Sequence, residues 1–117
     1  MKREIRFRTW DNNENKMKYE NYFGSTADLL KWSYNYACEI MQFTGLKDKN
    51  GKDIYEGDIF RYEEEEQDIV YEVVVFNQKE AKFMIHADNE FFDIDISNEV
   101  IGNIYENSEL LKEQDEC

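Results

Sequence analysis

From Ile54 to Tyr105 the sequence is a series of short β-prone runs separated by turn signals. The strongest run is IVYEVVVF at residues 69–76, and its residues 73–76 are apolar without alternation. A strand that is apolar on both sides is either central and covered on both faces, or it contacts another subunit. The other strands of this region are predicted at residues 53–55, 59–62, 82–87, 91–96 and 99–105.

Turn residues determine how these strands connect. Asn50-Gly51 suits positive φ at both positions, which predicts a type I′ turn that closes a tight hairpin. Gly57 can adopt backbone conformations that other residue types avoid, so we predict a bulge or sharp bend just before Ile59. Further turns are expected at residues 77–80 and at Asp88-Asn89.

The N-terminal region is predicted to form a basic hairpin followed by a short helix. Residues 2–10 alternate with the period of a half-buried strand, and residues 11–15 (DNNEN) are typical of a turn. The returning strand is predicted at residues 16–23. Ser25 or Thr26 is suited to cap a helix over residues 27–36.

A further strand is predicted at residues 38–44, between this helix and the Asn-Gly turn. At the other end of the chain, Asn107-Ser108 can cap a short turn or helix over residues 109–112. The acidic tail at residues 113–117 is expected to be frayed.

Together these segments predict a mainly β protein of the β-rich α+β type. It has an N-terminal hairpin, a short middle helix and a C-terminal small SH3-like barrel or sandwich of about five short strands. A length of 117 residues, with no proline and 5 glycines, gives no linker signal. We predict one domain over residues 1–117, with subregions at 1–40 (hairpin and helix), 41–112 (barrel-like) and 113–117 (tail).

Charge is divided unevenly along the chain, whose formal net charge is −13. Residues 1–58 carry ten Lys or Arg and ten Asp or Glu, whereas residues 59–117 carry four and seventeen. Such a field repels phosphate backbones, so we expect no direct binding of nucleic acid. A basic partner is electrostatically favoured.

The sequence also indicates a compartment. No apolar run is long enough to cross a bilayer, and MKREIRFRTW lacks the apolar core of a signal peptide. Cys38 and Cys117 form neither a metal-ligand spacing nor a disulfide framework, which fits a reducing environment. We therefore expect a cytoplasmic protein that does not bind membranes.

Candidate catalytic and metal-binding residues are few. A nucleophile pair of Cys38 and His86 is formally available, but nothing in the local sequence activates either residue. Asp93 and Asp95, with Asp88 and Glu90 nearby, could present carboxylates to Mg²⁺ or Ca²⁺. The favoured interpretation is that these carboxylates are solvated, on the strand face opposite a buried face of Phe and Ile side chains.

A faint calcium-loop pattern at residues 48–52 (DKNGK) lacks the later ligands of such a loop and is interpreted as turn chemistry. We therefore assign no catalytic, cofactor-binding or metal-ligating residue. No cofactor is expected, and the protein is predicted not to be an enzyme.

Two charged segments could contact partners. Residues 63–66 (EEEE) and Asp68 are typical of a solvated loop, and alternatively form a surface that binds a basic protein. The basic residues of the N-terminal hairpin, interleaved with Phe7 and Trp10, are Lys2, Arg3, Arg6 and Arg8. They resemble a nucleic-acid stripe. We favour their packing against the acidic half, within the chain or across a subunit boundary.

Three segments carry a family resemblance. These are R-x-W-D at residues 8–11, MQFTGLKDKNGKDIYEGDIF at residues 41–60 and EVIGNIYENSELL at residues 99–111. They resemble the YopX-like family of small proteins that bacteriophages and prophages carry. The resemblance implies a β-rich, self-associating accessory protein in the cytoplasm of a bacterial host cell. The family has no established activity, so no functional residues are transferred.

Three functions remain open for the sequence. The favoured one is a non-enzymatic protein-interaction or self-assembling module, which we expect to be a homo-oligomer, because the run at residues 73–76 is apolar on both sides. The second is an acidic inhibitor or adaptor that binds a basic host protein, such as a nucleic-acid-binding protein. The third, ranked last, is a metal-assisted enzyme that uses Asp93 and Asp95.

Overall fold

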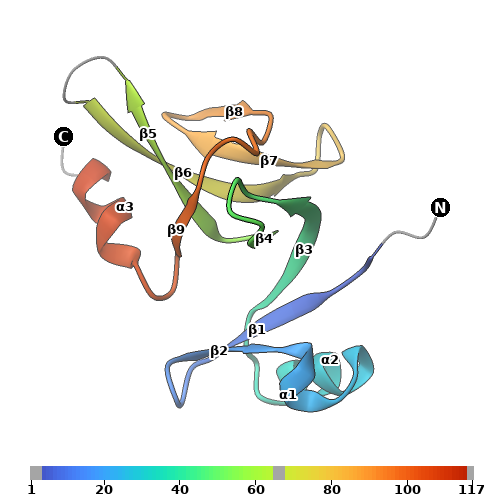
Figure 1. Ribbon diagram of the computed structural model, residues 1–117. Helices are drawn as coiled ribbons and strands as arrows, with labels where there is room; N and C mark the ends of the chain where they lie inside the picture. The colour runs from blue at the N-terminus through green and yellow to red at the C-terminus, as the bar shows by residue number, and fades with distance from the viewer. Residues whose placement is uncertain (1–3, 65–67, 116–117) are drawn as a thin grey trace.

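The structure, a computed structural model, describes residues 4–64 and 68–115. Two antiparallel sheets dominate this part of the chain, and one of them curls into a half-barrel (Figure 1). Three short helices accompany the sheets within the described residues. The protein is therefore mainly β, which confirms the predicted fold class.

The first sheet has the strand order β2-β1-β3-β4. Its strands are β1 (Phe7–Asp11), β2 (Lys16–Tyr19), β3 (Ile40–Lys47) and β4 (Asp53–Tyr55). Trp10, Met17 and Met41 form a small buried cluster on this sheet. Tyr105 packs against the cluster from the C-terminal region, and its ring stacks on Trp10 with 5.3 Å between centroids. The N-terminal hairpin thus packs against the segment that follows β9.

The second sheet has the order β8-β7-β6-β5-β9 and forms the half-barrel. Its strands are β5 (Asp58–Glu64), β6 (Asp68–Asn77), β7 (Lys82–Ala87), β8 (Glu90–Phe92) and β9 (Val100–Asn103). Its core consists of Ile54, Phe60, Val74, Ile85 and Val100, with Ile94 packed against them. Ile54 belongs to the first sheet, so β4 closes the open side of the half-barrel.

The run that is apolar on both sides lies in the central strand β6, between β5 and β7. Val74 is buried in the core, whereas Val73 and Val75 point to the other face and are half-buried. Helix α3 (Ser108–Asp115) contacts β6 and covers part of that face (Figure 1). Phe76 lies on the same face as Val74, near the end of the strand, and is 46% exposed. The strand is therefore covered at Val74 and only partly covered on its other face.

The predicted second strand at residues 16–23 is too long. β2 ends at Tyr19, and Glu20–Phe23 form helix α1, which Gly24 ends with a left-handed φ of 88°. The Glu20 side chain accepts a hydrogen bond from Phe7 N at 2.9 Å. This bond satisfies the backbone group that a longer β2 would have paired.

The turns differ from prediction in one respect. At the β3–β4 connection only Gly51 has positive φ, and Asp48 N donates to Lys52 O across a wider turn, so the type I′ prediction is wrong there. The geometry with two positive φ values occurs instead at Asp88-Asn89, between β7 and β8. Gly57 has φ of 86° just before β5, which confirms the predicted bend.

The strand predicted at residues 91–96 is also too long, because β8 ends at Phe92. The Asp95 carboxylate accepts hydrogen bonds from both the backbone N–H and the hydroxyl of Ser97, which turns the chain away from the sheet. Phe92 and Ile96 are 44% and 53% exposed, so the predicted buried Phe and Ile face is wrong at these two positions.

The helices agree better with the sequence. Ser25 caps α2 (Thr26–Asn35) by accepting a hydrogen bond from Asp28 N at 3.1 Å. Helix α3 begins at Ser108 and extends to Asp115, so much of the predicted frayed tail is helical. None of the helices in the described part of the chain is long and apolar enough to span a membrane.

Candidate functional site

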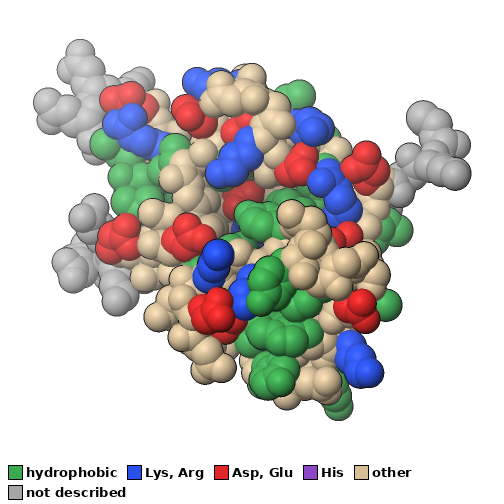
Figure 2. All heavy atoms as spheres, turned by 60° about the horizontal axis from the view of Figure 1, so that its bottom comes forward, with side chains coloured by type: hydrophobic (Ala, Val, Ile, Leu, Met, Phe, Trp, Pro, Cys, Tyr) green, Lys and Arg blue, Asp and Glu red, His purple; other side chains and the backbone are tan. Residues whose placement is uncertain are grey.

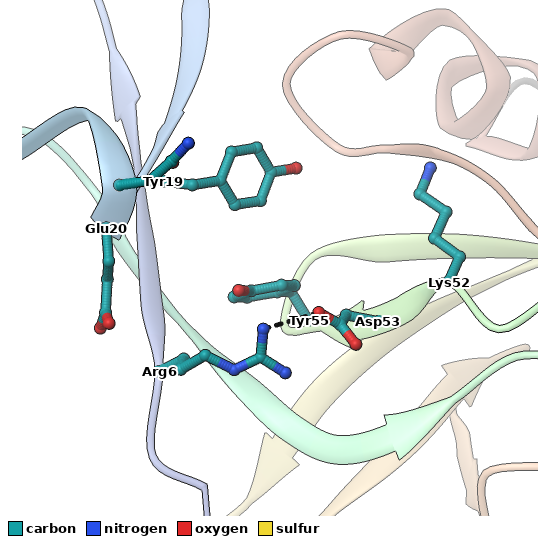
Figure 3. A pocket seen from close by; sticks show the side chains of 7 residues that line it. Arg6, Tyr19, Glu20, Lys52, Asp53 and Tyr55 are labelled. Carbon is teal, nitrogen blue, oxygen red and sulfur yellow. Dashed lines mark hydrogen bonds and ion pairs between the residues drawn. The ribbon is translucent and has the colours of Figure 1, made fainter.

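A cleft of about 380 Å³ lies on the first sheet, between β4 on one side and the end of β2 with the start of α1 on the other. Figure 3 shows its side chains, with the Tyr19 and Tyr55 rings above Arg6 and the Lys52 side chain on the far side. Arg6 Nη1 donates to Asp53 Oδ2 at 2.8 Å. The two tyrosine rings meet edge to face, with 5.6 Å between centroids.

The Arg6–Asp53 pair of this cleft has further contacts within the protein, although Arg6 Nε is buried without a hydrogen-bond partner among the described residues. Asp53 also lies 3.2 Å from Lys47 Nζ, and the Arg6 guanidinium stacks over the Phe43 ring at 4.1 Å. Burial alone would raise the pKa of Asp53, but Arg6 and Lys47 outweigh it and hold that pKa below its usual value. The cleft is therefore a structural junction between β1 and β4.

A second ion pair lies deeper in the same junction. Arg8 Nη2 donates to Asp58 Oδ1 at 2.9 Å and to Glu56 O at 3.0 Å, and both charged side chains are only 2% exposed. The other oxygen of Asp58 accepts a hydrogen bond from Tyr55 N. The guanidinium also lies over the Tyr55 ring. This pair joins β1 of the first sheet to β5 of the second.

Lys18 is held in a third internal pair. Its Nζ lies 2.8 Å from Asp11 Oδ2 and 3.2 Å from Glu14 Oε2. The same ammonium faces the rings of Tyr22 and Trp32. The hydrogen bond to Asp11 is the main reason that the pKa of Lys18 lies above its usual value.

These pairs join Arg6, Arg8 and Lys18 to acids of the same half of the sequence. In Figure 2, where the bottom of Figure 1 comes forward, Lys and Arg side chains lie among Asp and Glu side chains on the surface. The prediction that Arg6 and Arg8 pack against the acidic second half is wrong, because their partners Asp53 and Asp58 precede it. The other two basic residues of the stripe, Lys2 and Arg3, lie outside the described residues.

A groove of about 310 Å³ lies on the half-barrel sheet and is called the acidic groove below. Its four carboxylates belong to Glu72, Asp88, Asp93 and Asp95. Its apolar wall includes Tyr62 of β5, Ile85 of β7 and Phe92 of β8, and no Lys or Arg is among its described lining residues.

Glu72 is the deepest acid of the acidic groove. It is 7% exposed, and its Oε1 atom is shielded from water without a hydrogen-bond partner among the described residues. Burial raises the pKa of Glu72, and the negative charge of Asp95 raises it further. A buried acceptor without a partner is costly, which distinguishes the Glu72 carboxylate from the three exposed acids of the groove.

Residues 6–112 match the model of a protein family described as YopX protein. This match covers nearly the whole chain. The chain belongs to the YopX family. A comparison of this YopX-family protein with curated proteins finds no match. Among solved structures it is similar to protein EF1440 from Enterococcus faecalis, with a TM-score of 0.63 and 26% identity over 94% of this chain and 99% of that chain.

In this YopX-family protein the structure brings together three of the four carboxylates considered for a metal. Asp88, Asp93 and Asp95 line the acidic groove. Asp93 pairs with Lys82 at 2.7 Å, and Asp95 caps the Ser97 turn. No group of three or more His, Cys, Asp or Glu side chains suited to a metal ion occurs in residues 4–64 and 68–115.

The other candidate residues are not assembled into a site. The Cys38 thiol contacts Tyr36 O, whereas the His86 ring packs beside Phe91, and no hydrogen bond joins Cys38 to His86. The oxygens of Asp48 accept hydrogen bonds from Asn50 N, Lys52 N and Val100 N, which confirms that residues 48–52 form a turn. Glu65 and Glu66 of the acidic run, and Cys117, lie outside the described residues.

Sequence reasoning missed Glu72. A signal was available in the run IVYEVVVF, where Glu72 is the one charged residue and lies two positions before Val74. Positions two apart on a strand share a face, so a buried Val74 places Glu72 on the inner face as well.

Proposed function

We propose that this YopX-family protein is a non-enzymatic protein-interaction module that binds a basic segment of another protein on its acidic half. The observation that carries the proposal is the acidic groove, which gathers four carboxylates without any Lys or Arg in its described lining. Arg6, Arg8 and Lys18 pair with acids of the first half, and of the four groove carboxylates only Asp93 has a lysine partner, Lys82, among the described residues. Opposite potentials steer and orient such encounters.

The test is a titration with a fluorescently labelled peptide of alternating Arg and Ser, followed by anisotropy. The control peptide carries Glu in place of Arg. We expect binding of the Arg peptide that weakens as NaCl is added, because salt screens exposed charges. Absence of binding to the Arg peptide, or equal binding of both peptides, would refute the proposal.

Self-association is the second candidate, and a specific surface favours it. A groove of about 220 Å³ lies beside β6, and its lining combines Val73, Val75 and Ile40 with the acids Glu39 and Glu56. Ile40 and Phe76 at this groove are 39% and 46% exposed. Since two copies of net charge −13 repel each other, added salt should strengthen self-association, whereas it should weaken binding of a basic partner. Sedimentation equilibrium at low and high salt distinguishes the two.

The family resemblance supports a biological setting for this module. We propose an accessory protein of a phage or prophage that acts in the cytoplasm of the bacterial host. A basic partner there would include host nucleic-acid-binding proteins, for which an acidic surface competes with the phosphate backbone. Capture of such a protein, reversed by added DNA and lost on charge reversal of Asp88 and Asp93, would support this role. Capture that added DNA leaves unchanged would contradict it.

A further inference from the structure

The acidic groove is large enough to hold one long side chain. Its volume of about 310 Å³ lies at the lower limit of ligand pockets, which are about 300 to 1,000 Å³. Its apolar wall and Glu72 come from β5, β6, β7 and β8, whereas Asp88, Asp93 and Asp95 lie in the β7–β8 turn and in the segment after β8. Glu72 is thus held on a strand, and sites on strands are held more firmly than sites on loops.

Glu72 lies in the central strand of this sheet and lacks a partner. Its Oε1 atom is inaccessible to water and accepts no hydrogen bond from the described residues. Asp95, the charged group that most affects Glu72, is also an acid, and burial together with Asp95 raises the Glu72 pKa. Such a group gains most from a cation that enters the groove from outside the chain, because the cation restores the missing hydrogen bonds and offsets the repulsion.

The chemistry of the wall distinguishes between cations. Tyr62 and Phe92 are 44% exposed each and lie beside the carboxylates, so the groove combines negative charge with aromatic surface. A metal ion prefers several converging oxygen ligands, and no such group of three occurs among the described residues. A guanidinium is planar and weakly hydrated, stacks on rings and donates two parallel hydrogen bonds to a carboxylate.

We propose that the acidic groove binds one arginine side chain of the partner protein, with the guanidinium at the Glu72 carboxylate and the methylene stem along the wall formed by Tyr62 and Phe92. Asp88 and Asp95, together with Asp93 and its partner Lys82, are the exposed charged residues at the groove, and their net negative charge attracts the cation. This inference rests on the proposed function and adds the residue that is recognised. It assigns to Glu72 the role of specificity residue.

The test uses a blocked peptide with one Arg between neutral residues, and two related peptides in which Lys or the uncharged isostere citrulline replaces that Arg. Binding is followed by amide NMR shifts of the full chain, which suit weak affinities. The variants are Glu72→Gln and, as a matched control, Glu106→Gln, which removes one exposed charge outside the groove. Folding of both variants is checked from the same spectra.

We expect the Arg peptide to shift the amides of β6 and β8 around Glu72 and Phe92. Replacement of Arg by citrulline, and Glu72→Gln in the protein, should each weaken binding about tenfold, the equivalent of about 1.4 kcal/mol. Glu106→Gln should change the affinity less than about twofold, as expected for a distant exposed charge.

Several outcomes would overturn the inference. Equal weakening by Glu72→Gln and Glu106→Gln would mean that only overall charge matters. Equal binding of the Lys and Arg peptides would remove the guanidinium assignment. If Glu72→Gln binds the Arg-rich peptide of the previous section as tightly as the unmodified protein, this inference fails while the proposed function stands. If neither peptide binds the unmodified protein, both fail.

Discussion

The Arg8–Asp58 pair is the residue contact on which the junction of the two sheets depends. Both side chains are buried, and each has a second polar partner in the backbone of residues 55–56. Replacing such a pair by apolar residues is often neutral, but removing one partner leaves a buried charge without compensation. The pair therefore favours one relative position of β1 and β5 over others.

Asp58→Asn should lower the free energy of unfolding by about 3 kcal/mol, since it leaves Arg8 uncompensated in the interior. Urea denaturation followed by tryptophan fluorescence measures the change. Asp93→Asn is the matched control, because its partner Lys82 is half exposed and a surface pair contributes little. Equal losses in the two variants would show that the buried pair has no special role.

Glu72→Gln should stabilise the free protein at neutral pH. Burial and Asp95 raise the Glu72 pKa above its ordinary value of 4.5, so the fold favours the protonated acid. The stability associated with this group is full below that value and is lost as pH rises through the higher folded pKa. We expect a gain of about 1 kcal/mol at pH 7, comparable to relief of one unsatisfied buried group.

Chemical denaturation of Glu72→Gln and of the unmodified protein, at pH 7 and at about pH 4, tests this prediction. The difference between them should vanish at about pH 4, where Glu72 is protonated in both states. Carboxylates that do not interact with Glu72 titrate equally in the two proteins and cancel in the difference, whereas Asp95, which does interact with it, is part of the measured effect. A gain that is the same at both pH values would contradict the ionisation argument. Together with the binding test, a gain at pH 7 would identify Glu72 as a residue kept for function at the expense of stability.

At the scale of elements, β5 depends on the bend at Gly57. Gly57 N donates to Val74 O and Gly57 O accepts from Ile104 N, so this residue connects β6 to the segment after β9. Its φ of 86° suits glycine, and a Cβ there would lie 3.3 Å from Met41 Sδ. Gly51 has a similar φ of 81° but open space around it.

Gly57→Ala should therefore cost more stability than Gly51→Ala. The left-handed conformation alone costs about 1 to 2 kcal/mol for a residue with a Cβ, and this applies to both variants. The contact with Met41 adds to the cost only at Gly57. Thermal unfolding of the two variants should rank them in that order, and the reverse order would show that the turn before β4 is the more rigid one.

The elements that the sequence predicted well are those that local residues determine. The strands predicted at residues 53–55 and 82–87 have the bounds of β4 and β7, because alternation and flanking turns define them. Helix α1 was missed, since its start depends on a Glu20 contact with Phe7. The Ser97 turn likewise shortened β8 through a side-chain bond that strand propensity does not report.

The candidate site was predictable only in part. Asp88, Asp93 and Asp95 are close in sequence and were recognised as a group, whereas Glu72 joins them through the pairing of β6 with β7. The Arg8–Asp58 pair spans fifty positions in the sequence, so hydrophobic periodicity carries no information on it. Contacts of this kind follow from the packing of two sheets and become visible only in the fold.

At the scale of the whole molecule, the division of charge nearly coincides with the division into two sheets. The half-barrel takes β5 to β9 from the acidic half, while β4 of the neutral half supplies Ile54 to its core. In the described ion pairs of Arg6, Arg8 and Lys18, both partners lie within residues 1–58. The excess of −13 is therefore concentrated on the half-barrel and its C-terminal extension, where like charges repel one another.

This division predicts opposite effects of salt on stability and on binding. Raising NaCl from about 10 mM to about 300 mM shortens the Debye length from about 30 Å to below 10 Å and screens the repulsion within the acidic half. The buried pairs are screened much less, so the unfolding temperature should rise by about 4 °C, equivalent to about 1 kcal/mol for a domain of this size. Binding of the Arg peptide should weaken over the same range.

Choline chloride at equal ionic strength is the control, since an effect of Na⁺ alone would indicate a specific cation site instead of screening. A fall in unfolding temperature would mean that exposed pairs such as Lys82–Asp93 outweigh the repulsion, and that the acidic half lacks the uncompensated field on which recognition of a basic partner depends.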